Sequence, residues 1–147
     1  MRSTARSLPF SLAAATVLSV AAPSACTHAA GATQALDYSR TRLSARGRYR
    51  ATIRPQGDSI PQGRLQRWTL HVETAAGAPV DSGDFSVDGG MPQHGHGLPT
   101  RPRVTRALGN GDHLVEGMKF NMGGWWVVRF GVNAEAGRDS VVFNVRL

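Results

Sequence analysis

Apolar and polar residues alternate along most of this chain, and that two-residue period is the feature that most constrains its fold. In a β-strand, side chains two positions apart lie on the same face, so each alternating segment buries one face and exposes the other. No window shows the apolar period of an amphipathic helix. Turn sequences rich in Gly and Pro separate the segments. The six segments contain Tyr49/Ala51/Ile53, Trp68/Leu70/Val72, Phe85/Val87, Leu114/Met118/Phe120, Trp126/Val128/Phe130/Val132 and Val141/Phe143/Val145.

A weaker candidate strand over residues 103–108 brings the total to about seven. That number and spacing predict an all-β fold, an immunoglobulin-like antiparallel β-sandwich over residues 45–147. In the fourth segment we assign Met118 to the buried face together with Leu114. This parity places His113 on the surface. It also leaves Glu116 as a charged residue within an apolar face, where we expect it to pair with an arginine.

The stretch from Gly89 to Pro102 interrupts the alternation. Four glycines and three prolines lie within it. Glycine permits unusual backbone angles, whereas proline fixes φ and removes a hydrogen-bond donor, so the stretch is not expected to form an interior strand. We interpret it as an ordered loop at one end of the sandwich.

This loop carries the residues with the clearest potential for chemistry. His94 and His96 form an H-x-H pair, whose side chains point to the same side in an extended segment. Met91 in the same loop and Met122 at the end of another strand add thioethers. Imidazole suits copper and zinc, and thioether favours Cu(I), so the hypothesis is a copper site formed by these four residues. The alternative is that both histidines are polar loop residues without a metal.

A second set of residues is a candidate contact surface. Trp126 is in phase with Val128 and Phe130 and is predicted to lie in the core, so the adjacent Trp125 takes the opposite face. Aromatic side chains at such places bury a large area while keeping a polar group available. Trp125 is therefore a candidate for binding a partner or ligand, together with Gly95 and Leu98 of the loop.

The N-terminus has the pattern of an export signal. Arg2 and Arg6 precede an uncharged apolar stretch, and small residues follow it. We expect a signal peptide over residues 1–25, with cleavage between about 25 and 30, and then a flexible arm over residues 26–44. The protein is expected in the periplasm or cell envelope, and Cys26, the only cysteine, is a possible lipid attachment site. Membrane association would then be peripheral or through that lipid.

The formal net charge is +7, but Lys119 is the only lysine among 17 basic residues. Arginines at positions 46, 48, 50 and 54 share one parity and so form a solvated strand face. Such a face would attract an anionic surface or an acidic partner. Export argues against nucleic acid as a partner.

The run VDGGMPQHGHGLPTRPRVT, the later LVEGMKFNMGGWWVVRF and the upstream RLQRWTLHVETAAGAPV resemble the YtkA-like and FixH-like group of bacterial exported domains. The resemblance covers roughly residues 64–132. The resemblance implies an immunoglobulin-like sandwich related in shape to CopC-type copper carriers. Some members of this group are labelled auxin-binding.

Enzymatic chemistry has little support, because neither a G-x-S-x-G motif nor a zinc-protease spacing occurs. We therefore expect a non-catalytic, monomeric binding domain. One hypothesis is copper binding through the loop. The alternative is a metal-free interaction module, an accessory to an envelope or respiratory complex.

Overall fold

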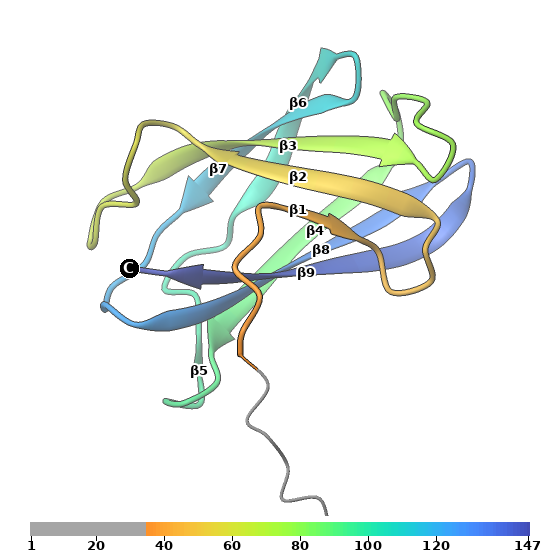
Figure 1. The fold of residues 1–147 in the computed structure, drawn as a ribbon. Coiled ribbons are helices and arrows are strands. Elements are labelled where there is room, and N and C mark those ends of the chain that lie inside the picture. Colours follow the sequence, from red (N-terminus) through yellow and green to blue (C-terminus); the bar gives the residue numbers. More distant parts are fainter. Residues whose placement is uncertain (1–34) are drawn as a thin grey trace, which may run out of the picture. The chain divides into compact units, whose positions relative to one another are not determined.

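The computed structural model describes residues 35–147, so the predicted signal peptide and Cys26 lie outside the described part. Nine strands form two antiparallel sheets that face each other as a sandwich (Figure 1). One sheet has the order β1-β2-β3-β7-β6 and the other β5-β4-β8-β9. The strands are β1 (Thr41–Leu43), β2 (Tyr49–Pro55), β3 (Gln66–Thr74), β4 (Asp84–Met91), β5 (His96–Gly97), β6 (Arg103–Gly109), β7 (Asp112–Met118), β8 (Trp125–Ala134) and β9 (Gly137–Arg146).

Seven of the nine strands have seven residues or more, which confirms the predicted sandwich and its approximate strand number. The predicted alternation is also confirmed in β2, β3, β8 and β9, where every second side chain is buried. Within residues 35–147, no helix is long and apolar enough to span a bilayer.

Aromatic side chains form the centre of the core between the sheets. Trp68, Phe120 and Trp126 are almost completely buried and pack in succession, with ring centroids 5.8 and 5.2 Å apart. Burial of one such side chain contributes roughly 1.5–3 kcal/mol relative to its exposure. Trp126 is thus a core residue, as its position in the alternating pattern predicts. It lies at the end of the sandwich that carries the loop histidines, in contact with His96.

In the first half of β7, the prediction of which side chains face the core is wrong. His113 and Val115 face the core, whereas Leu114 and Glu116 face outward. Gly117 has φ +84°, and the pairing of β7 with β3 shifts register beside it. A bulge of this kind inserts one extra residue and exchanges the faces, so Met118 returns to the core.

Glu116 is therefore an outward-facing residue of the sheet and not a charge within an apolar face. It accepts hydrogen bonds from Arg67 Nε and Thr105 Oγ1, each at 2.9 Å. The bonds from Thr105 and Arg67 hold the pKa of Glu116 below its usual range. The expected pairing with an arginine is confirmed, although for a different position of the side chain.

The sandwich begins before residue 45, so the predicted arm over 26–44 was too long. β1 pairs antiparallel with β2, from Thr41 opposite Thr52 to Leu43 opposite Arg50. This three-residue strand has no buried apolar set. For that reason the two-residue alternation that identified the other strands does not detect it.

The carboxylate of Asp139 in β9 anchors this first segment. It accepts hydrogen bonds from Ser44 Oγ at 2.6 Å and from the backbone N–H groups of Arg46, Arg48 and Ser140. Burial raises the pKa of Asp139, but these hydrogen bonds outweigh burial and hold the pKa below its usual range. The turn between β1 and β2 is thereby attached to the opposite sheet.

The predicted loop over 89–102 is also partly strand. Gly89 pairs with Val128 of β8, and Gly90 pairs with Gly97 of β5, so β4 extends to Met91. A Cβ at Gly89 would lie 2.5 Å from the Val127 carbonyl oxygen. Here the glycines permit close approach of neighbouring strands, and the prediction that they end the strand is wrong.

Candidate functional site

The candidate site begins with the short hairpin of β4 and β5. Met91 and His96 are directly opposite each other in this hairpin. The intervening turn is closed by the backbone N–H groups of His94 and Gly95, which both donate to the Met91 carbonyl oxygen, at 3.1 and 3.0 Å. Side chains of directly opposed residues lie on the same face. Since Met91 is buried in the core, His96 also faces inward.

The His96 ring packs against the core indole below it. Its centroid lies 5.5 Å from that of Trp126, in an edge-to-face arrangement. His96 Nδ1 lies 3.1 Å from the Gly97 carbonyl oxygen. A carbonyl oxygen only accepts, so Nδ1 carries the proton in this bond and Nε2 of the neutral ring has a free lone pair. The interaction thus sets the tautomer in which Nε2 is able to bind a metal ion.

His96 Nε2 is buried and has no hydrogen-bond partner among residues 35–147. An unsatisfied buried polar atom costs about 1–3 kcal/mol, and most buried polar groups in proteins are paired. This atom is the only buried side-chain nitrogen or oxygen in the described part of the chain that lacks a partner. It therefore needs an explanation, and a bound ligand supplies one.

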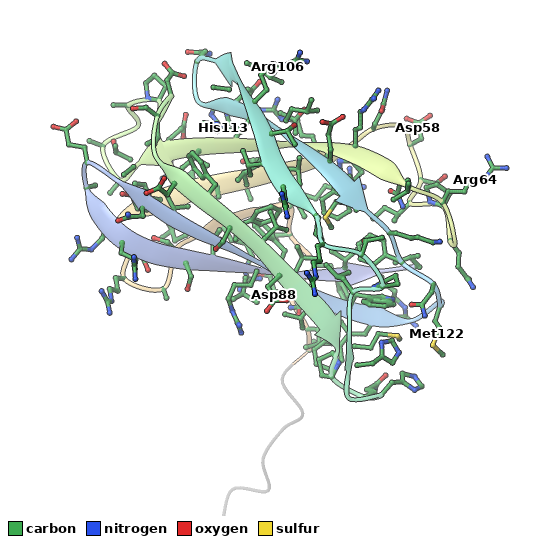
Figure 2. The ribbon with its side chains drawn as sticks, turned by 180° about the vertical axis from the view of Figure 1, so that it is seen from behind. Asp58, Arg64, Asp88, Arg106, His113 and Met122 are labelled. Atoms are coloured by element: carbon green, nitrogen blue, oxygen red, sulfur yellow. The ribbon has the colours of Figure 1, made fainter. Side chains whose placement is uncertain are left out.

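Two thioethers lie near His96. The sulfur atoms of Met91 and Met122 are both close to His96. Met91 is 1% exposed and Met122 is 37% exposed, so one sulfur comes from the core and the other from the surface. The Trp126 indole N–H donates to the Met122 carbonyl oxygen at 3.1 Å and fixes the backbone there. Figure 2 shows Met122 at the end of the sandwich that carries the hairpin.

Gly124 allows this packing. It has φ +117°, a conformation that side chains rarely permit, and a Cβ at this position would lie 3.1 Å from Met91 Cε. The space that Gly124 leaves for Met91 depends on the three-dimensional packing and has no local signal in the sequence.

The available donors are soft. In the described part of the chain, no group of three or more His, Cys, Asp or Glu side chains is arranged to hold a metal ion. The set at the hairpin is instead one imidazole nitrogen with two thioether sulfurs. Such donors favour Cu(I), whereas carboxylate and carbonyl oxygens suit harder ions.

His94 is brought to the same end but occupies a different environment. It is exposed in the turn, with its ring centroid 6.0 Å from that of His96. The backbone there is not extended, because Gly95 has φ +66°. The two imidazoles therefore do not point to the same side as the H-x-H spacing predicts, and only His96 is turned inward.

Of the other predicted contact residues, Leu98 and Trp125 lie outside the hairpin turn. Leu98 is partly buried against the core, and its N–H donates to the Gly89 carbonyl oxygen at 3.0 Å. Trp125 is half-buried on the opposite face of β8 from Trp126. Its indole N–H donates to Asn144 Oδ1 at 3.0 Å. These positions leave Gly95 as the only one of the three in the turn itself.

The prediction that His113 lies on the surface is wrong. It is 1% exposed, its Nε2 lies 2.7 Å from the Val80 carbonyl oxygen, and its ring packs against Phe85 in a tilted arrangement at a centroid distance of 4.2 Å. The register shift at Gly117 reverses its expected face. This histidine is fully engaged in packing and hydrogen bonding, unlike His96.

A charged network covers the outer face of β2, β3 and β7. His71 lies between Asp112 at 2.7 Å and Glu73 at 3.3 Å. Arg54 contacts the same aspartate at 3.3 Å. Burial raises the pKa of Asp112, but the hydrogen bonds from His71 and Arg54 more than offset this and lower it. The arginines of β2 thus belong, at least in part, to ion pairs within the sheet face.

Comparison with known proteins identifies the family of the chain. Its residues 44–131 match the family model described as YtkA-like. No curated protein and no solved structure is detectably similar. Because the match covers more than half of the chain, the protein belongs to the YtkA-like family.

Proposed function

We propose that this protein is an exported, non-catalytic domain that binds one copper ion as Cu(I), held by His96, Met91 and Met122. The observation that carries the proposal is the buried His96 Nε2, which has no hydrogen-bond partner among residues 35–147. A metal ion would use its lone pair and remove the cost of leaving it unpaired.

The chemistry of the neighbouring groups supports copper over other metals. Zn²⁺ takes Cys, His or carboxylate donors, of which this set offers only one imidazole, and Mg²⁺ prefers oxygen donors, whereas thioethers favour Cu(I). The Trp126 indole beside His96 adds an electron-rich face. A cation close to such a face gains further stabilisation.

The donors differ in burial, and this supports a site that exchanges copper with other proteins over a site that holds copper permanently. His96 and Met91 are held by the hairpin and the core, whereas Met122 is 37% exposed. A metal ion at this position would be reachable from solvent on the Met122 side. Exchange with another protein would then need movement of one surface side chain and no opening of the sandwich.

The test is an anaerobic Cu(I) titration of the purified protein in competition with a chromophoric Cu(I) chelator. We expect one ion per chain, and at least about a 100-fold loss of affinity in His96→Ala. The matched control is His94→Ala, which removes an exposed imidazole from the same turn and should change affinity less than about tenfold. Met118→Leu is the corresponding control for Met91→Leu and Met122→Leu, since Met118 lies in the core.

The proposal fails if the wild-type protein does not compete with the chelator, or if His96→Ala binds as tightly as the wild type. In either case the metal-free alternative, an accessory module of an envelope complex, becomes the function to pursue. The fold of each variant is checked by near-ultraviolet circular dichroism, because the three tryptophans report on core packing.

A further inference from the structure

The three methionines of the described chain differ sharply in their access to solvent. Met118 is 0% exposed and Met91 is 1% exposed, whereas Met122 is 37% exposed. Oxidation of a thioether requires that an oxidant reach the sulfur. Met122 is therefore the accessible site, and it is also one of the three proposed copper donors.

We propose that Met122 is an oxidation site that switches the copper site off, an inference that rests on the proposed function. Hydrogen peroxide transfers one oxygen atom to Met122 Sδ. Its O–O bond breaks, the thioether loses two electrons to form the sulfoxide, and water leaves. The sulfoxide is polar and no longer presents the soft sulfur donor that favours Cu(I). The site is left with His96 and Met91.

The surroundings of Met122 make this modification compatible with the fold. Its backbone is held by the bond from the Trp126 indole to the Met122 carbonyl oxygen, and this bond does not involve the sulfur. The side chain lies at the surface, so a polar sulfoxide there remains hydrated. The same modification at Met91 would place a polar group in the core. The oxidised protein therefore stays folded, and a methionine sulfoxide reductase restores the donor.

Occupancy of the site protects Met122. A metal ion bound through one sulfur lone pair withdraws electron density from the sulfur and blocks approach to it, so the remaining lone pair attacks peroxide more slowly. The empty protein is thus the form that is oxidised, and the loaded protein is spared. Ag(I) is the appropriate probe of this protection, because it is a soft cation like Cu(I) but does not generate radicals from peroxide.

The experiment treats the purified full-length protein with hydrogen peroxide, with and without Ag(I), and follows each methionine by peptide mass spectrometry. We expect one added oxygen on Met122 well before Met91 or Met118, and about tenfold slower oxidation with Ag(I) bound. After peroxide, Cu(I) affinity should fall by at least about tenfold and recover on reductase treatment. Met122→Leu is the control, since peroxide should leave its remaining Cu(I) affinity unchanged.

Two results overturn the switch alone: oxidation of Met91 as fast as Met122, or undiminished Cu(I) affinity in protein oxidised at Met122. Absence of Cu(I) binding by the untreated protein is a different failure. It overturns the proposed function and the switch with it. Measuring Cu(I) affinity before peroxide treatment therefore distinguishes the two.

Discussion

Replacement of Gly90 by alanine should damage the hairpin that carries the candidate site. A Cβ at this position would lie 2.5 Å from the His96 carbonyl oxygen, below the 3.0 Å limit that real Cβ contacts respect. The two strands must therefore separate by at least about 0.5 Å, within a ladder of only two residue pairs. We expect a loss of about 1–3 kcal/mol in the free energy of unfolding. Because His96 moves with β5, Cu(I) affinity should fall about 10- to 100-fold.

Gly97→Ala is the matched control, because Gly97 is the direct partner of Gly90 in the same ladder. Its Cβ would meet nothing closer than 3.5 Å, and its effect on stability should stay within about 0.5 kcal/mol. Urea unfolding followed by tryptophan fluorescence gives the stabilities, and chelator competition gives the affinities. Equal stability and equal affinity of the two variants would show that the close approach of β4 and β5 does not position His96.

Three further predictions concern other parts of the sandwich. Asp139→Asn should lower the free energy of unfolding by about 1–3 kcal/mol at pH 7. Because the folded-state pKa of Asp139 is depressed, this contribution is present above the unfolded pKa near 4 and is lost as pH falls through the folded value, so wild type and variant should converge in acid urea titrations. Trp126→Phe removes the donor to the Met122 carbonyl oxygen. The resulting loss in the free energy of Cu(I) binding, from chelator competition, should exceed the loss in the free energy of unfolding, from urea titration. Arg67→Ala breaks an exposed pair with Glu116 and should cost less than about 1 kcal/mol in the same unfolding assay; a larger loss would contradict the assignment of that pair to the solvent face.

The sequence was sufficient for the strands with regular alternation, because burial on one face leaves a two-residue period. It was insufficient at the glycines. At Gly117 the backbone is left-handed, and the side chains before and after it reach the core at opposite parity. The preceding residues do not indicate this change. Gly89 and Gly90 suggested a loop, although their role is to let backbones approach closely. A glycine in the sequence indicates conformational freedom. Whether it forms a turn, a bulge or a close contact between strands depends on the segments that pack against it.

The candidate site was predictable in its residue types and not in its geometry. One methionine and two histidines in a Gly/Pro-rich stretch, with Met122 at the end of another strand, suggested a soft metal, and His96 and Met91 are indeed neighbours across the hairpin. The difference between His94 and His96 depends on where the turn begins, which the H-x-H spacing does not specify. The approach of Met122 to His96 joins segments that are distant in the sequence, and no local pattern encodes it.

The position of Leu147 has a practical bearing on the metal titrations. Leu147 and Gly124 exchange two backbone hydrogen bonds, at 3.1 and 3.2 Å, and Gly124 is only two positions from Met122. A purification tag fused after Leu147 would therefore start beside the proposed copper donors. A polyhistidine tag there would supply competing imidazoles and report its own affinity for the metal. Proteins for metal titrations should carry a cleavable tag elsewhere, or none at all.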